Sequence, residues 1–415
     1  MDAFDLRYMK RIRFTLRTIG AWPNHVFEDL PTSKLAAISR YGYTSFLFTI
    51  CCIGMVAQAV YLVNNKGTLP FIDLGQSCLT LLCCIVYIGR TMLPLQTAYQ
   101  ELIKKFASKF HLIHHKNMTD FSAKMYDKVN KICEIATIVE HIQLYMAAFM
   151  FNIAPLYLNY SAGMLSLDRP VNATFDHSVY YALPVDPTDG FWFTIICVYN
   201  WYVSYNLACV FTCQDLQICV FVFHIWGHLT IFEHNLNYFP RPRIHVGSKT
   251  EPLRYSNEEK VEVAAELKDI IKHYIMIKQF VVQTSDTYSV TLCVYLGFHL
   301  VSDCILLLEC SPLEIDALVK FGFMTVALYQ QLIQVSVVFE LISSKGDGLA
   351  DAVYGLPWEC MDDGNRRTVL ILLQVVQQSL PLKACGMVPI GVQTMLAILK
   401  ASFSYFLMLR TFANN

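Results

Sequence analysis

The chain has 415 residues, of which 55% are hydrophobic and only 16% are charged, and its formal net charge is −1. This composition lies on the membrane side of a soluble average, and the near-zero charge gives no support for a nucleic-acid partner. The fifteen cysteines lie mostly in apolar runs, without a CxxC pair or a Cys and His spacing that would bind zinc. We expect them to be small buried hydrophobes, and the sequence predicts no metal and no cofactor.

Seven apolar stretches long enough to cross a bilayer follow one another along the chain. We expect membrane spans at about 41–63, 71–93, 133–158, 191–223, 285–308, 319–342 and 388–412. Residues 1–40 precede them, with Leu6, Met9, Ile12 and Leu16 at helical spacing among basic residues. This pattern predicts an amphipathic helix that lies on the membrane surface or docks against other helices. The fold prediction is an all-α, seven-transmembrane helical membrane protein.

The basic residues predict the orientation of these spans. Of the 32 Lys and Arg residues, 27 fall in the N-terminal segment, in the 2–3 and 4–5 connections and before the last span. Because cytoplasmic segments carry the excess of Lys and Arg, we expect a cytoplasmic N-terminus and an extracellular C-terminus. The sequon Asn172-Ala-Thr then lies in the outer 3–4 loop, where we expect it to carry a glycan.

The last sixty residues contain two helix-like pieces. The first, 366–380, is separated from the last span by Pro381 and by residues 384–386. Within the last span, small or weakly polar residues recur on one face, namely Gly391, Thr394, Ala397, Ala401, Ser404 and, at its end, Met408. Such a face packs closely against another helix or lines a water-filled path.

Lys400, near the middle of the last span, bears on that choice. A lysine there costs about 2.5–3.5 kcal/mol unless it meets water or a partner. Lys400 therefore favours the water-filled path, with an acidic residue of another helix as the alternative.

This terminal unit resembles the insect odorant receptor family, and its moth members in particular. The matching residues are Tyr354, Trp358, the Gln377-Gln378 end of the helix 366–380, the closing run 400–410 and the stretch 19–23, IGAWP. The resemblance implies a ligand-gated cation channel in which an odorant-specific tuning subunit and a shared co-receptor form a heterotetramer. The 4–5 connection lacks the long insertion of the co-receptor, which implies a tuning subunit.

The family resemblance also implies how the chain is divided. It implies a cytoplasmic segment 1–40, spans 1–6 with the ligand-binding bundle over 41–343, a cytoplasmic helical anchor over 344–385, and a pore-lining span over 386–415. The resemblance also implies that the chain lies in the plasma membrane, in contact with membrane lipid, in the dendrites of olfactory neurons. The implied pore and gate residues are Lys400, Ser404, Met408, Thr411 and Phe412, with Met408 and Phe412 one turn apart at an apolar constriction.

The same resemblance implies a pocket for a small, volatile, hydrophobic odorant in the outer half of the bundle. Depth along spans 2, 3, 4 and 6 nominates Leu74, Cys78, Leu144, Ala147, Phe151, Ile195, Tyr199, Phe321, Met324 and Thr325. They are mainly apolar, with a few hydroxyls, which suits a volatile with one polar group. The alternative for each is ordinary core packing. We expect His299 and Asp303 of span 5 to be buried and paired rather than bound to ligand.

Two other functions remain open at this point. A gustatory receptor of the same superfamily usually closes on a Thr-Tyr-x-x-x-x-Gln-Phe signature, which this sequence lacks. An integral-membrane enzyme or transporter would need clustered His or acidic residues within the spans. Only scattered ones exist, such as Glu140-His141, so no catalytic constellation is predicted.

Overall fold

The computed structural model describes residues 3–23, 34–166, 173–243, 254–311, 315–378 and 382–413. The prediction of an all-α chain is confirmed, because long helices dominate these residues and the single sheet has two strands of two residues. Most of each predicted span lies in a helix: α3 (Lys34–Asn65), α4 (Phe71–Thr91), α6 (Asp120–Ser161), α7 (Gly190–Asn237), α8 (Asn257–Cys310), α10 (Phe323–Tyr354) and α12 (Val392–Ala413). The sixth and seventh predicted spans start a few residues before α10 and α12. In the described chain, six of these helices are long and apolar enough to cross a membrane, and the apolar part of α12 is shorter, Val392–Met408.

Shorter elements connect these helices. The α-helical ones are α1 (Arg7–Thr18), α5 (Thr97–Lys105), α9 (Ile315–Ala317) and α11 (Asp363–Val376). Short 3-10 turns lie at Ala3–Asp5, Leu93–Leu95, Leu112–His114 and Trp358–Cys360, and π-turns at Phe106–Phe110 and Leu318–Gly322. The helix expected at 366–380 is α11, and Asn172 lies outside the described residues.

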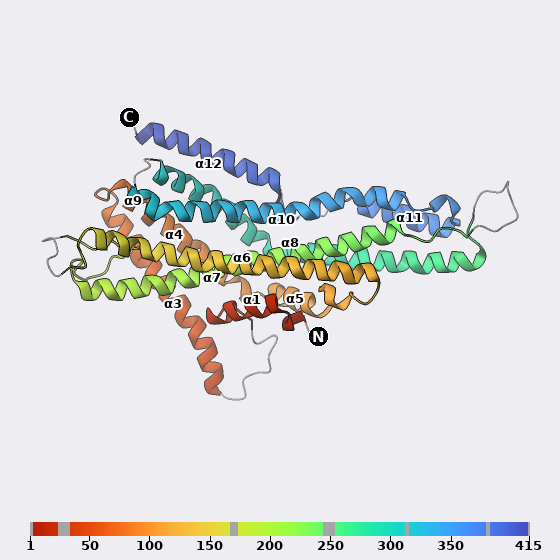
Figure 1. Cartoon of the computed structure of the whole chain (residues 1–415), viewed down its shortest axis with the longest axis horizontal. Coiled ribbons are helices and arrows are strands. Elements are labelled where there is room, and N and C mark those ends of the chain that lie inside the picture. The colour runs from red at the N-terminus through yellow and green to blue at the C-terminus, as the bar shows by residue number, and fades with distance from the viewer. Residues whose placement is uncertain are drawn as a thin grey trace.

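The long helices run side by side and give the molecule an elongated shape (Figure 1). The 48 residues of α7 and the 54 of α8 correspond to about 70 and 80 Å of helix. Both lengths far exceed the roughly 30 Å hydrocarbon core of a bilayer. The bundle therefore continues beyond any membrane layer, toward the end that carries α11 (Figure 1).

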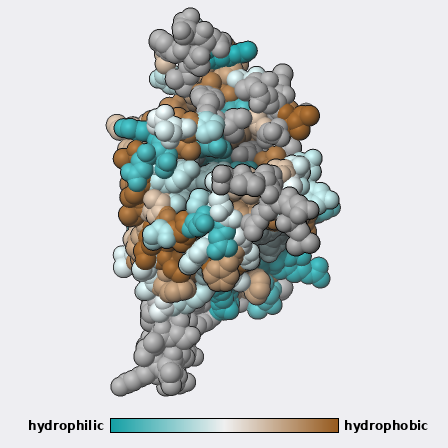
Figure 2. Space-filling model, turned by 90° about the vertical axis from the view of Figure 1, so that its left-hand side faces the viewer, coloured by the Kyte–Doolittle hydropathy of each residue, from teal (hydrophilic) through white to brown (hydrophobic). Residues whose placement is uncertain are grey.

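Helix α7 is the centre of the bundle and packs against α1, α4, α6, α8 and α10. Every residue from Cys213 to Ile225 is buried, which is the pattern of a helix that is apolar on all sides. Helix α12, by contrast, packs against α8 and α10 and lies at the edge of the molecule (Figure 1). Viewed from the end that carries the α6–α7 connection, hydrophobic and hydrophilic side chains share the visible surface (Figure 2).

A hairpin joins α11 to α12. Its strands β1 (Lys383–Ala384) and β2 (Val388–Pro389) pair antiparallel. Cys385 and Gly386 have φ angles of 49° and 69°, the left-handed conformation that type I′ hairpin turns require and that glycine adopts readily. The backbone N–H of Cys385 donates to Ser289 O at 3.0 Å, which attaches the turn to α8. The chain break predicted at residues 384–386 is this turn.

The N-terminal helix α1 docks on α6 and α7, and its predicted apolar residues Met9, Ile12 and Leu16 are buried. Tyr8, which is fully buried, lies between two imidazole rings. Its oxygen is 2.5 Å from His111 Nε2 and 3.1 Å from His224 Nε2.

Backbone hydrogen bonds assign the protons on both rings. The N–H groups of Ile113 and Leu112 donate to Nδ1 of His111 and His224, so each neutral ring carries its proton on Nε2. Both Nε2–H groups then donate to the Tyr8 oxygen. Burial and the neighbouring His114 and His115 lower the pKa of His111 to about 3, which keeps that ring neutral.

Replacing Tyr8 with Phe should therefore loosen the N-terminal helix. The change leaves two buried N–H groups without an acceptor, which costs about 1–3 kcal/mol of unfolding free energy. We expect Tyr8→Phe to lower the melting temperature of detergent-purified protein and to expose residues 1–23 to protease. Tyr157→Phe, at a tyrosine that is 55% exposed, should do neither. Equal behaviour of the two variants would contradict the assigned role of Tyr8.

Candidate ligand-binding site

A cavity of about 150 Å³ lies inside the bundle, where α6, α7 and α10 meet. It is lined by Thr80, Cys83 and Cys84 of α4, by Gln143, Ala147, Ala148, Met150 and Phe151 of α6, by Val179 and Tyr181 of the α6–α7 connection, by Asn200, Val203, Ser204, Leu207, Ala208, Phe211 and Thr212 of α7, by Phe298 of α8, and by Phe323, Met324, Ala327, Leu328 and Gln331 of α10. None of these side chains is charged, so the cavity suits a neutral, mainly apolar molecule.

The structure brings three of the nominated pocket residues to this cavity, namely Ala147, Phe151 and Met324. The others do not line it. Leu144 is buried in the main core, Phe321 packs with Leu79 and Leu306, and Ile195 is 43% exposed. Leu74 and Cys78 are half-buried on α4, Tyr199 donates its hydroxyl to Ile50 O at 3.1 Å, and Thr325 donates its hydroxyl to Phe321 O at 2.8 Å.

Part of the lining comes from the α6–α7 connection, which contributes Val179 and Tyr181. The Tyr181 hydroxyl donates to Asn200 Oδ1 at 3.0 Å, and Asn200 Nδ2 donates to Val179 O at 3.3 Å. These two bonds attach the connection to α7 at the cavity wall. Sequence reasoning missed both residues, because an irregular connection has no periodicity that shows which side chain turns inward.

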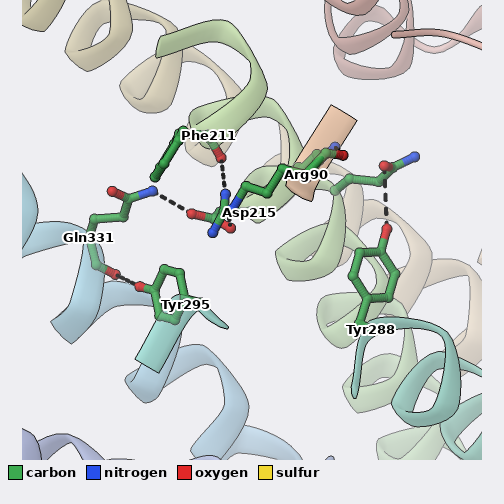
Figure 3. A network of polar contacts seen from close by, with 8 residues as sticks. Arg90, Phe211, Asp215, Tyr288, Tyr295 and Gln331 are labelled. Atoms are coloured by element: carbon green, nitrogen blue, oxygen red, sulfur yellow. Dashed lines mark hydrogen bonds and ion pairs between the residues drawn. The ribbon is translucent and has the colours of Figure 1, made fainter. Parts of the chain in front are cut away.

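A buried ion pair lies beside the cavity (Figure 3). Arg90 Nη1 of α4 is 3.0 Å from Asp215 Oδ1 of α7, and the two side chains are only 2% and 7% exposed. The same guanidinium donates to Phe211 O at 3.1 Å and lies 4.5 Å from the centre of the Phe211 ring. Gln331 of α10 donates its amide N–H to Asp215 Oδ2. Phe211 and Gln331 also line the cavity, so the ion pair and the cavity share two residues.

The ion pair also connects to α8, because the Tyr295 hydroxyl donates to Gln331 O at 3.1 Å (Figure 3). Four helices thus meet at one polar cluster. A signal for it was present in the sequence, since a lone acid in the apolar run 191–223 and a lone arginine in span 2 each need a partner within a membrane. Nothing in the sequence showed that each was the partner of the other.

His299 and Asp303 of α8 do not line the cavity. Both are fully buried, and His299 Nδ1 lies 3.7 Å from Asp303 Oδ1. The expectation that they are buried is met, and they lie close enough for an ion pair, but neither side chain makes a hydrogen bond with a described residue. In the part of the chain that the structure describes, no group of three or more His, Cys, Asp or Glu side chains could hold a metal ion.

Helix α12 carries the candidate pore residues. Lys400, Ser404, Met408 and Thr411 are exposed on it, and the Phe412 side chain lies outside the described residues. The helix packs instead through Met395, Ile398, Ser402 and Phe406, and the Ser402 hydroxyl donates to Leu300 O of α8 at 3.2 Å.

The small-residue face of α12 is thus covered only near its start. There a Cβ on Gly391 would lie 2.6 Å from Glu340 Oε2, which accepts from the Val392 N–H. Toward its other end Ala397, Ser404 and Met408 are exposed. Lys400 forms no ion pair with any residue that the structure describes. Among the described residues of this chain, neither close packing of the whole face nor an acidic partner for Lys400 is observed.

These features define a multi-pass helical membrane protein with a cavity between its helices, lined in part by a loop. The sequence matches the family model described as 7tm Odorant receptor over residues 70–403, which is most of its length. The chain therefore belongs to the 7tm odorant receptor family. This match favours the odorant receptors over the gustatory alternative.

The fold is similar to that of solved insect receptors. The structure of the insect olfactory receptor OR5 from Machilis hrabei superposes with a TM-score of 0.76 at 13% identity, over 97% of each chain. The structure of the same receptor in complex with eugenol gives a TM-score of 0.76 at 14% identity, over 98% of each chain. No curated protein sequence matches this chain significantly.

Replacing Arg90 with Met should strongly destabilise the protein. The change leaves Asp215 buried without its counter-charge, and breaking a buried pair costs about 3–5 kcal/mol. We expect Arg90→Met to lower surface expression and the melting temperature of purified protein. Arg90→Met combined with Asp215→Leu should recover much of the loss, because it removes both charges. A double variant no more stable than the single one would show that the ion pair does not determine stability here.

Proposed function

We propose that this chain is the odorant-binding tuning subunit of a heteromeric, ligand-gated cation channel. The observation that carries the proposal is the cavity between the helices, which is mainly apolar, lacks charge and lies in a chain of the odorant receptor family. A neutral volatile compound is the kind of ligand that such a lining favours. The receptor of similar fold from Machilis hrabei is known in complex with eugenol, a small organic molecule, which supports a ligand of this kind.

The proposed orientation places the end with α11 in the cytoplasm and the α6–α7 connection outside. The excess of Lys and Arg on the first side supports it. Residues 1–40 and 344–385 then form the cytoplasmic N-terminal segment and anchor, residues 41–343 the ligand-binding bundle, and residues 386–415 the pore segment. The N-terminus is then inside and the C-terminus outside.

The anchor offers a surface for a partner subunit. Leu370 and Ile371 of α11 are 65% and 61% exposed, on a part of the bundle that extends beyond the membrane layer. Tyr354 and Trp358 are also exposed nearby, with ring centres 6.2 Å apart. Exposed apolar side chains in water favour association. We assign this surface to the co-receptor in a heterotetramer at the plasma membrane of olfactory neuron dendrites.

In this assembly the uncovered face of α12 lines the conduction path. Lys400 and Ser404 would meet water there, which avoids the cost of a bare ammonium in lipid. Met408, Thr411 and Phe412 would lie at the outer constriction, which resists ions while it is narrow, apolar and dry. Odorant binding opens such a gate only through a higher affinity for the open state.

The experiment that tests the function is heterologous expression with and without an insect co-receptor, with current recorded against a panel of volatiles. We expect evoked current only with the co-receptor. Phe151→Ala, in the cavity lining, should raise the half-maximal concentration about ten-fold, because it removes apolar contact with the ligand. Phe149→Ala, at a residue 48% exposed on the same helix, should not. Robust evoked current from the chain alone would refute the tuning-subunit assignment.

Substitution of Met408 by Ser tests the gate. A hydroxyl at the constriction lowers the cost of wetting, so Met408→Ser with wild-type co-receptor should raise the current in the absence of odorant. The leak should be partial, because the other subunits keep their apolar residues. Leu407→Ser is the control, since Leu407 is similarly exposed but lies about 100° away from Met408 around the helix axis. Loss of odorant response without leak, at normal surface expression, would remove Met408 from the gate.

A further inference from the structure

Most polar side chains in the cavity wall already have hydrogen-bond partners. The Thr80 hydroxyl donates to Gln76 O, and the Ser204 hydroxyl donates to Trp201 O. The Gln143 amide donates to Ala327 O and accepts from Gln330, and Asn200 is bonded to the α6–α7 connection. A ligand competes poorly for groups that are satisfied within the protein.

Two polar atoms in the wall differ. The Thr212 hydroxyl makes no hydrogen bond with any described residue, although Thr212 lines the cavity and is half-buried. Gln331 donates its amide N–H to Asp215, so its amide oxygen is the free end. In Figure 3 this oxygen points away from Asp215. No described residue donates to it.

Both residues lie next to Asp215. Thr212 is three residues before Asp215 on α7, so the two side chains share a helix face. Gln331 contacts Asp215 from α10. The Phe211 and Phe298 rings, with centres 5.3 Å apart, flank this region. A donor and acceptor, Thr212, and an acceptor, Gln331, thus line the same cavity as the Phe211 and Phe298 rings.

The cavity volume limits the size of the ligand. At about 150 Å³ it matches the size of engineered cavities that hold one benzene molecule. A volume of this size favours a ligand with about one ring. No charged side chain lines the cavity, so an acid or an amine would find no opposite charge there.

We propose that the cavity selects a neutral, one-ring alcohol or phenol. Its hydroxyl donates to Gln331 Oε1 and accepts from the Thr212 hydroxyl, while its ring packs against Phe211 and Phe298. This inference rests on the proposed odorant-binding function and adds the chemical class of the ligand and the two residues that determine specificity. Because Gln331 also holds Asp215, the bound hydroxyl contacts the buried polar cluster directly.

The test uses matched sets of three probes on the receptor co-expressed with its co-receptor: benzyl alcohol and 2-phenylethanol, their methyl ethers, and hydrocarbons of equal size. The ethers accept but cannot donate, and the hydrocarbons do neither. Thr212→Val should weaken the apparent affinity for alcohols and ethers about 3- to 10-fold and leave that for hydrocarbons unchanged. Thr212→Ser should restore the apparent affinity for alcohols and ethers. Gln331→Met should remove the preference for alcohols over ethers.

Thr230→Val is the matched control, since Thr230 lies on the same helix away from the cavity and its hydroxyl donates to Trp226 O at 2.8 Å. Thr230→Val should not change the apparent affinity for any of the probes. Surface labelling accompanies every variant, and if Gln331→Met fails to reach the surface, the Thr212 variants decide alone.

Several outcomes would overturn the inference. In one, Thr212→Val weakens the apparent affinity for hydrocarbons as much as that for alcohols, which would show that Thr212 acts by packing and not by hydrogen bonding. In another, the receptor responds to long-chain or charged compounds but to no one-ring alcohol, which would refute the ligand class and leave the odorant-gated channel intact. No evoked current from any volatile with the co-receptor at the surface would instead refute the proposed function itself.

Discussion

The buried pair of Arg90 and Asp215 is the constraint on which the centre of the bundle depends. Apolar side chains pack against one another in many arrangements, because the hydrophobic effect has no direction. A guanidinium and a carboxylate removed from water do not have that freedom, since burying either ion without a partner costs several kcal/mol. Here Asp215 accepts from Arg90 and from the Gln331 amide, and Arg90 Nη1 also donates to the Phe211 carbonyl, while Arg90 Nε and Nη2 have no hydrogen-bond partner among the described residues. The relative positions of α4, α7 and α10 at this depth therefore follow from hydrogen-bond geometry.

The cavity lies against that cluster and shares residues with it. Phe211 presents its ring to the cavity and its carbonyl oxygen to Arg90, and Gln331 has one end of its amide on Asp215. A molecule in the cavity thus touches side chains whose positions are set by the buried charges. From there Tyr295 connects the cluster to α8, and α8 contacts α12 through Ser402 and Leu300. This chain of contacts joins the cavity wall to the last helix.

Different hydrogen bonds attach the α6–α7 connection and helix α1 to the bundle. At the cavity end, the α6–α7 connection is attached by the Tyr181–Asn200 hydrogen bond. Toward the other end, Tyr8 holds α1 through two neutral imidazoles, one from the α5–α6 connection and one from α7. Helix α12 has one covered face and one uncovered face, as α3 and α6 also do.

The sequence alone determined the helices and much of their surroundings. Apolar length identified the seven helices that hold the predicted spans, helical periodicity identified the buried face of α1, and turn chemistry identified the chain break at residues 384–386, because these signals are local. The pocket was a different case. Depth along each helix nominated ten residues, but only Ala147, Phe151 and Met324 line the cavity, because depth does not set the rotation of a helix about its axis. That rotation follows from contacts between residues far apart in the sequence, above all from the pairing of Arg90 with Asp215. Only the tertiary structure could therefore place Thr212, Gln331 and Tyr181 around one cavity.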